Sequence, residues 1–380
     1  VAISLLFSFL YPQHELSIAN RLRSENFFVS VSSEILPEYR EYERTSTTAV
    51  NAFVSPILDQ YLSTLSTNIK DARLQVMQSN GGMIGIDKAR KNGVRCILSG
   101  PAGGVIGAQY LAKLTQPLHH KAGTDSSSVQ LITFDMGGTS TDVSLIKGTP
   151  SLTSEASVDG YPISIPVLDI HTIGAGGGSI AYIDKGGALR VGPQSAGADP
   201  GPACYGKGDL PTVTDANLVL GRLVPEFFLG GNMKLDPDRS WKSIQQLGKT
   251  LGMTATQCAR GIITVANAHM EHALRVISVE RGHDPREFTL FSFGGAGGLH
   301  ATELARALMI PNIIISPFAS VLSAFGMLAA DTVLDYVQTV MYSNAYSQEQ
   351  IDQRFHPLIQ QGISDLLLQG IEISNIIVQS

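Results

Sequence analysis

The sequence has 380 residues, of which 43% are hydrophobic and 16% are charged, and its net charge is −6. This length accommodates two or three domains with a buried core, and this composition excludes a disordered chain. No dense run of Lys and Arg indicates nucleic-acid binding, and no segment is apolar for long enough to span a membrane. Three scattered cysteines, Cys96, Cys204 and Cys258, fit free, buried thiols, so we expect a protein of the reducing cytoplasm.

Strand and helix patterns alternate along the chain, which is typical of the α/β class. In the first part of the chain, the expected strands are 1–10, 29–33 and 74–77, and the expected helices are 12–24, 45–65 and a helix of small residues that ends near 114. The segment 119–128 is polar and irregular, and we expect it to link two lobes.

In the second part of the chain, the helix 258–281 is the clearest element, because Gly282 and Pro285 follow it as a stop signal. Proline and glycine dominate 186–211, which favours ordered loops over regular structure. The remaining expected strands are 129–134, 143–146, 288–293 and 312–316, and the remaining expected helices are 299–308 and 348–369.

The strongest motif is the segment 132–146, ITFDMGGTSTDVSLI, where a turn of glycines and hydroxyls joins two strands. A P-loop or a Rossmann loop would continue into a helix, so this pattern disfavours both. Backbone amides that no Cβ obstructs can face phosphate oxygens, and hydroxyl side chains can add donors. We therefore expect a phosphate-binding turn, with a plain tight β-hairpin as the alternative. The expected phosphate-binding residues are Gly137, Gly138, Thr139, Ser140 and Thr141.

Two acidic residues flank this turn, and both are candidate catalytic residues. Asp135 ends the first strand and is expected to hold Mg²⁺, which prefers oxygen ligands and keeps much of its water shell. Asp142 lies at the start of the second strand and is expected to hold a water molecule or a hydroxyl group of the hairpin.

A second glycine cluster, FSFGGAGGLH in 291–300, follows a buried strand and precedes a helix. The N-terminus of a helix with bare backbone suits a nucleotide, because its amides are free to bind an anion. A tight strand–helix turn is the alternative. The expected cofactor-binding residues in this cluster are Gly294, Gly295, Gly297 and Gly298.

Two further segments are rich in glycine. Small residues in 99–108, SGPAGGVIGA, let two helices cross closely, either as a hinge or as ordinary packing. In 169–179, DIHTIGAGGGS, His171 is a candidate general acid or base, and Asp169 lies two residues earlier on the same strand face. A metal site made of Asp169, His171 and Asp199 is one alternative, and a purely structural histidine is another.

These segments, in this order, resemble the actin, sugar-kinase and heat-shock-chaperone ATPases, which have a ribonuclease H-like α/β fold with mixed sheets flanked by helices. In this resemblance, 99–104 looks like the first connection between the lobes, 134–146 like the second phosphate hairpin, 291–300 like the adenosine loop and 320–329 like the second interlobe helix. It implies that 1–115 ends the first lobe and connects the lobes, that 116–330 is the second lobe, and that 331–380 starts a C-terminal domain.

Other segments are similar to the hydantoinase A/5-oxoprolinase family, which includes acetone-carboxylase-type subunits. They include YERTSTTAVNAFV, QVMQSNGGM, SAGADPGPACYG and SVERGHDPREF. The resemblance implies an enzyme that uses ATP and Mg²⁺ to phosphorylate the carbonyl of a cyclic amide or imide, such as hydantoin, N-methylhydantoin or 5-oxoproline, and so opens the ring. It also implies an oligomer and a B-type partner subunit or domain.

The family also carries an earlier phosphate hairpin of Asp-x-Gly-Gly-Thr type, which this sequence lacks. The sequence does not begin with Met. We therefore expect a fragment that holds half of a nucleotide cleft and is inactive alone. Two other functions stay open: the ATP-using subunit of a ketone carboxylase, and a non-catalytic switch like the chaperone ATPases.

Overall fold

The computed structural model describes residues 1–69, 72–115, 129–341 and 346–379. The expected linker 119–128 lies outside the described residues. The chain forms two compact units, of which unit 1 comprises Val1–Ala102, Leu152–Leu168 and Ala330–Ser380, and unit 2 comprises Gly103–Ser151 and Asp169–Ala329. The expected division into 1–115, 116–330 and 331–380 stays a prediction.

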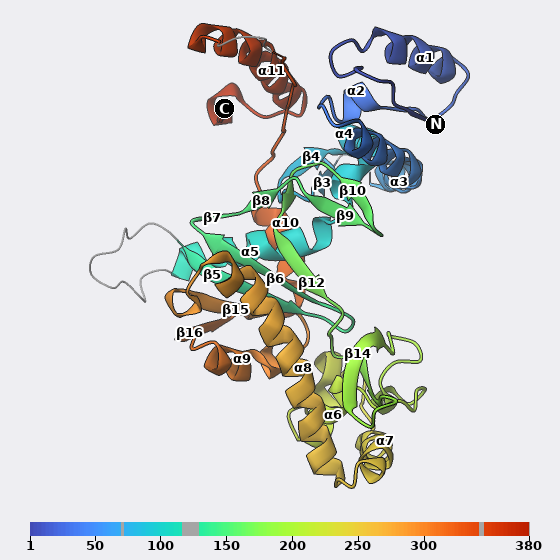
Figure 1. Ribbon diagram of the computed structural model, residues 1–380, viewed down its shortest axis with the longest axis vertical. Helices are drawn as coiled ribbons and strands as arrows, with labels where there is room; N and C mark the ends of the chain where they lie inside the picture. Colours follow the sequence, from blue (N-terminus) through green and yellow to red (C-terminus); the bar gives the residue numbers. More distant parts are fainter. Residues whose placement is uncertain (70–71, 116–128, 342–345, 380) are drawn as a thin grey trace. The chain divides into compact units, whose positions relative to one another are not determined.

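Unit 2 is built on a mixed sheet with the strand order β12-β6-β5-β15-β16 (Figure 1). The strand β5 pairs antiparallel with β6 and parallel with β15, so it lies in the middle of the sheet. Its apolar sequence fits this place, since a central strand is covered on both faces. The bounds are β5 Gln130–Met136, β6 Thr141–Lys147, β7 Thr149–Pro150, β12 Ile170–Ile173, β15 Thr289–Phe293 and β16 Asn312–Ile315.

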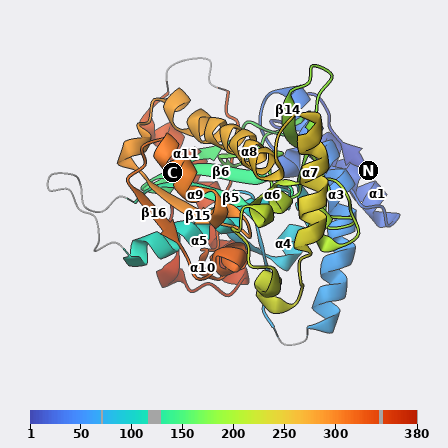
Figure 2. The same ribbon diagram turned by 90° about the horizontal axis from the view of Figure 1, so that it is seen from below.

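Helices cover both faces of this sheet. Figure 2 shows α8 on one side of β5 and β6, and α5 and α10 on the other. The helix α8, Ala255–Ile277, begins before the predicted residue 258 because Thr254 and Gln257 form a capping box. Its buried face, which includes Ile262, Ala266 and Met270, packs into the main core of unit 2. The prediction of an α/β fold with mixed sheets flanked by helices is therefore confirmed.

The helices α5, Ser99–Thr115, and α10, Leu322–Ala329, cross at very short range. A Cβ at Gly326 would overlap the carbonyl oxygen of Gly103 and lie 2.8 Å from the backbone nitrogen of Gly107. A Cβ at Gly103 would lie 2.6 Å from the carbonyl oxygen of Ser323. The small residues of α5 thus serve close helix packing, as the sequence predicts.

The rest of unit 2 joins a two-stranded sheet to short helices. Its elements are β13 Ser179–Ile183, β14 Leu189–Ser195, α6 Val213–Val219, α7 Pro237–Thr250 and α9 Ala301–Ala307. The prediction of loops throughout 186–211 is wrong for β14. Among the described strands, β14 pairs only with β13, and proline is tolerated in such an edge strand, so Pro193 does not exclude it.

In its described residues, unit 1 contains three long helices and several short strand pairs. Its elements are β1 Ala2–Ile3, α1 Gln13–Ser24, β2 Ser30–Val31, α2 Ser32–Ile35, α3 Glu41–Asn68, β3 Gln75–Met77, β4 Met83–Gly85, α4 Ile86–Lys91, β8 Leu152–Thr153, β9 Ala156–Val158, β10 Tyr161–Ile163, β11 Val167–Leu168 and α11 Gln348–Leu368. No helix in the described part of the chain is both long enough and apolar enough to cross a membrane.

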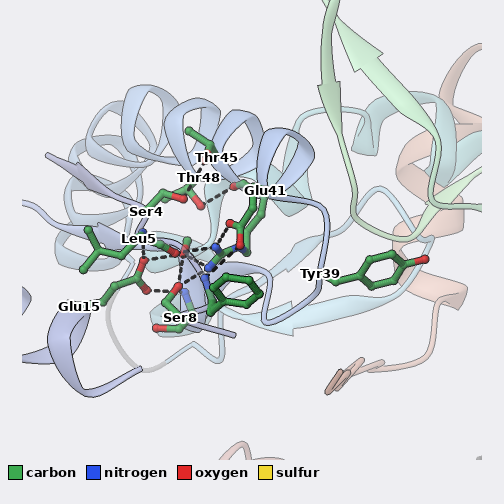
Figure 3. Close-up of polar contacts among 12 residues, drawn as sticks. Ser4, Leu5, Ser8, Glu15, Tyr39, Glu41, Thr45 and Thr48 are labelled. Atoms are coloured by element: carbon green, nitrogen blue, oxygen red, sulfur yellow. Dashed lines mark hydrogen bonds and ion pairs between the residues drawn. The ribbon is translucent and has the colours of Figure 1, made fainter. Parts of the chain in front are cut away.

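The predicted strand 1–10 is wrong beyond Ile3, because a buried polar cluster holds the next residues in turns (Figure 3). Arg44 is fully buried and donates hydrogen bonds to the carbonyl oxygen of Leu5, at 2.6 Å, and to Ser32, at 2.7 Å. The carboxylate of Glu15 accepts from the Leu5 amide at 2.7 Å. With both backbone groups of Leu5 taken by side chains, no strand can pair there.

The close crossing of α5 and α10 predicts the effect of adding one methyl group. We expect Gly326→Ala to lower the free energy of unfolding by about 1–3 kcal/mol, because the new Cβ overlaps the backbone of α5. The matched control is Gly100→Ala, on α5, where no described atom outside the adjoining backbone lies within 4 Å of the added Cβ. Its effect should stay within about 1 kcal/mol in urea unfolding. Equal stability of the two variants would contradict the crossing.

Candidate functional site

Three glycine-rich segments of unit 2 meet at one end of the central sheet. The turn between β5 and β6 contacts the loop that follows β12 through two backbone hydrogen bonds. The Gly177 amide donates to the carbonyl oxygen of Gly137 at 3.0 Å, and the Gly178 amide donates to that of Gly138 at 2.6 Å. Motifs that lie far apart in the sequence are therefore held together by main-chain contacts.

The loop after β15 completes this arrangement. The Ala296 amide donates to the carbonyl oxygen of Met136 at 3.0 Å, and so ties the loop to the end of β5. Gly294 has a φ of +79°, and a Cβ there would overlap the carboxylate of Asp135. Glycine at this position lets the loop take a left-handed turn directly beside Asp135.

The glycines of this site fall into two kinds. At Gly176 a Cβ would lie 2.6 Å from the Thr139 amide nitrogen, so close backbone packing requires glycine. At Gly138 and Gly295 no described atom lies within 4 Å of a built Cβ, and neither residue has a left-handed φ. Neither packing nor backbone conformation therefore requires glycine at those two positions, as expected where a ligand approaches the backbone.

The sheet register places three polar side chains in a row. Asp135 on β5 lies opposite Asp142 on β6, and Asp142 lies opposite Thr172 on β12. Directly opposed residues point to the same face of a sheet, so the three side chains share one face. The Thr172 hydroxyl donates a hydrogen bond to Oδ1 of Asp142. The two predicted acids are thus brought together.

Asp135 is half-buried, and its carboxylate has no hydrogen bond or ion pair with any of the described residues. Burial and, to a smaller extent, the charge of the nearby Asp142 together raise its pKa to about 6. Burial also raises the pKa of Asp142, which the hydrogen bond from Thr172 opposes. Two adjacent carboxyl groups that resist ionisation favour a cation beside them, because a positive charge would relieve both effects.

The predicted phosphate contact of Thr141 does not fit the structure. Thr141 is fully buried, and its hydroxyl donates to the carbonyl oxygen of Ala175 in the neighbouring loop. This hydroxyl therefore holds the site together, and it is not free to meet a ligand. Thr139 is exposed and Ser140 half-buried, so their side chains remain accessible, as that prediction requires.

His171 and Asp169 lie apart from the pair of acids. The register pairs His171 with Val143, and the side chain of Val143 points into the core on the opposite face from Asp142. Asp169 forms an ion pair with Arg281, in the short 3-10 helix Val279–Arg281 that follows α8. The structure does not bring these two residues to Asp135 and Asp142, so their catalytic role stays a prediction that the geometry does not support.

The alternative metal site does not form. Asp199 pairs with Lys207 on the surface at 3.3 Å, whereas Asp169 pairs with Arg281. Within 1–69, 72–115, 129–341 and 346–379, no three or more His, Cys, Asp or Glu residues are grouped to hold a metal ion. Cys204 and Cys258 are buried, as expected, whereas Cys96 is only half-buried.

His300, the last residue of the glycine-rich segment 291–300, is a buried residue to which the sequence assigned no role. His300 lies fully buried between Asn267, whose Oδ1 is 2.7 Å from Nδ1, and Asn217, whose Nδ2 is 3.3 Å from Nε2. Burial lowers its pKa to about 4, so the ring is neutral and carries its proton on Nδ1. No local pattern indicates this, because the two asparagines are distant in sequence.

The described sheet, its register and its glycine loops define an α/β protein of the actin-like class. In comparisons with known proteins, the profile described as hydantoinase/oxoprolinase matches residues 44–336. The chain therefore belongs to the hydantoinase/oxoprolinase family.

Relatives with names and structures support this placement. Caprolactamase subunit alpha of Pseudomonas jessenii is 38% identical over 382 residues, which cover 97% of this chain and 53% of that subunit. The 5-oxoprolinase of Saccharomyces cerevisiae is 38% identical over 397 residues, which cover 100% of this chain and 30% of that enzyme. The chain thus spans about half or less of these relatives.

Two solved structures share the fold. A crystal structure of the ATP-dependent caprolactamase from Pseudomonas jessenii matches with a TM-score of 0.83 and 36% identity, covering 99% of this chain and 55% of that one. A nucleotide-free acetone carboxylase matches with a TM-score of 0.78 and 29% identity, covering 98% and 54%. Both have the actin-like fold, and the predicted fold and family are confirmed.

The two kinds of glycine predict two different defects. We expect Gly138→Ala to leave the melting temperature within about 1 °C, because the added methyl group meets no protein atom, yet to weaken nucleotide binding about tenfold. Gly176→Ala should instead lower the melting temperature by about 3 °C or more, because its Cβ meets the Thr139 amide. Thermal unfolding and calorimetry distinguish these results. Loss of stability in Gly138→Ala would contradict an open turn.

The raised pKa of Asp135 predicts a pH-dependent stability. Since the folded state holds the Asp135 proton more tightly than the unfolded state, this residue costs stability as pH rises from about 4 through about 6. Without Mg²⁺ and nucleotide, Asp135→Asn should therefore match the parent near pH 4 and melt a few degrees higher near pH 7. Asp209→Asn, at an exposed site, is the control. A pH-independent difference would disprove the raised pKa.

Proposed function

We propose that these residues form part of the ATP-binding site of an ATP-dependent enzyme that opens a cyclic amide. The observation that supports this most is the half-buried carboxylate of Asp135, which has no partner among the described residues and lies beside a turn where no described atom comes within 4 Å of a Cβ placed on Gly138. Membership of the hydantoinase/oxoprolinase family and the likeness to an ATP-dependent caprolactamase support the same reaction. Because the chain spans about half of its relatives, the complete reaction is proposed for the whole protein.

The site fits Mg²⁺ with the nucleotide. Magnesium binds proteins through one or two carboxylates and completes its shell with water and phosphate oxygens, so a site with few protein ligands suits it. Asp135 would hold the ion, which would supply positive charge against the terminal phosphate groups. The raised pKa of Asp135 fits this role, because a bound cation favours the ionised carboxylate.

The turn between β5 and β6 would bind the phosphate groups. The backbone amides of Gly138 and Thr139 lie in an exposed turn, where the bare Gly138 leaves room for phosphate oxygens. Asp142, in the same row as Asp135, would orient the group that attacks the terminal phosphorus. The loop at Gly294, Gly295, Gly297 and Gly298 would border the nucleoside, as the resemblance implies.

The chemistry follows from the stability of an amide. The lactam oxygen attacks the terminal phosphorus as the bond to ADP breaks, and the amide oxygen becomes part of a phosphate leaving group. Water then adds to the activated carbon, and the C–N bond of the ring breaks as its nitrogen takes up a proton, which leaves an acyl phosphate. A second water molecule hydrolyses this acyl phosphate to a carboxylate and free phosphate. Fixed amides and a cation would stabilise the charge that develops during phosphoryl transfer.

The proposed partner and the proposed substrate ring rest on the named relatives. The relative from Pseudomonas jessenii is named as an alpha subunit, and we propose that this protein also acts with a second, B-type subunit or domain. Hydantoin, N-methylhydantoin, 5-oxoproline and larger lactams are candidate substrates. The likeness to acetone carboxylase favours one second candidate, the ATP-using part of a ketone carboxylase, since an enolate and a lactam oxygen need similar phosphate sites. No observation favours a non-catalytic switch.

We predict that the complete protein, with its partner, couples ring opening to ADP release, and that Asp135→Asn lowers kcat about 100-fold or more. The matched control, Asp209→Asn, makes the same change on a side chain that is 92% exposed and should keep parental activity. The assay measures ADP and the opened ring over a panel of lactams and imides, with acetone and bicarbonate in parallel. Turnover only with acetone would favour the carboxylase, and full activity of Asp135→Asn would contradict the proposed site.

A further inference from the structure

Thr172 occupies a place in the sheet that the sequence motifs do not mark. It lies on β12, opposite Asp142, and its side chain shares a face with both acids. Threonine on an exposed strand is common for reasons of β propensity alone. Here, however, the hydroxyl is committed to one carboxylate oxygen, Oδ1 of Asp142.

The second oxygen of Asp142 is left available. No donor from the described residues reaches Oδ2. Because Thr172 holds Oδ1, rotation of the carboxylate about its Cβ–Cγ bond is restricted, and the direction in which Oδ2 accepts a hydrogen bond is restricted with it. A carboxylate held through one oxygen and free at the other can orient a reacting group.

Strand pairing does not need this hydrogen bond. The strands β12 and β6 already pair over four residues, from Ile170 opposite Ser144 to Ile173 opposite Thr141. The Ser144 hydroxyl also donates to the carbonyl oxygen of Asp169 at 2.9 Å, which ties the start of β12 to β6. A surface hydrogen bond at Thr172 adds little to the stability of such a pair.

We propose that Thr172 is a positioning residue: it holds Asp142 by one oxygen so that the other accepts a hydrogen bond from the N–H of the amide whose oxygen attacks the terminal phosphate of ATP, or from a water molecule that takes the place of this amide. This inference rests on the proposed function. Thr172 itself touches neither nucleotide nor ring, and it acts only through Asp142. Its contribution therefore disappears when Asp142 no longer carries a carboxylate.

The test uses two substitutions at Thr172 in the complete protein. Thr172→Val keeps the shape but removes the hydroxyl, and it should lower kcat about tenfold while KM for ATP stays within about twofold. Thr172→Ser keeps a hydroxyl and should restore most of kcat. The matched control is Thr149→Val, on the exposed strand β7, where no described residue hydrogen-bonds to the hydroxyl. It should keep parental kcat.

A second comparison separates positioning from structure. In an Asp142→Asn background, Thr172→Val should cause no further loss, because the two residues act as one unit. Melting temperatures of the Thr172 variants should stay within about 2 °C of the parent. Full kcat in Thr172→Val, equal losses in the Val and Ser variants, or additive losses with Asp142→Asn would each overturn the proposal.

A binding measurement keeps this test independent of the ring. We compare the affinity for Mg-ADP with that for Mg-ADP plus aluminium fluoride, which imitates the phosphoryl group in transfer. Thr172→Val should weaken the second about tenfold and leave the first unchanged. Equal affinities in parent and variant overturn the role of Thr172 alone. If the parent binds neither complex, the proposed function fails, and the inference about Thr172 fails with it.

Discussion

The candidate site depends on the strand register of β5, β6 and β12. This register sets Asp135, Asp142 and Thr172 side by side on one face, and it sends Val143 and His171 to the other. Since successive side chains in a strand alternate between faces, a slip of one residue would bury the acids and expose the core. The large hydrophobic core under β6 therefore fixes the chemistry above it.

Around this row, the loops combine rigidity with open space. Gly176 and Gly294 lie where the backbone of one loop presses on the next, so the loops hold one another in place. At Gly138 and Gly295, by contrast, no described atom lies within 4 Å of the position that a Cβ would take. A phosphate site needs both properties, because fixed amides bind an anion only if the anion can reach them.

Local patterns predicted most of the elements and the two acids, because a strand, a turn and a strand are adjacent in sequence. They could not predict which face His171 shares with its neighbours across the sheet, since that needs the pairing of β12 with β6. Local patterns also could not predict hydrogen bonds between residues that are distant in sequence. Thr141 donates to the carbonyl oxygen of Ala175, and His300 contacts two distant asparagines. The apolar residues of 1–10 likewise favoured a strand, but this strand ends at Ile3 because the buried Arg44 binds the carbonyl oxygen of Leu5.

The path of the chain has a consequence for how the protein is made. The chain leaves unit 2 after Ser151 and returns at Asp169, whose amide donates to the Ser151 carbonyl oxygen at 2.9 Å. Within this sequence, the ribosome therefore makes the residues of unit 1 in three separate segments, Val1–Ala102, Leu152–Leu168 and Ala330–Ser380. Unit 1 cannot finish folding until the last of these has emerged. Unit 2, by contrast, could be produced on its own. A short peptide linker from Ser151 to Asp169 would replace the segment Leu152–Leu168.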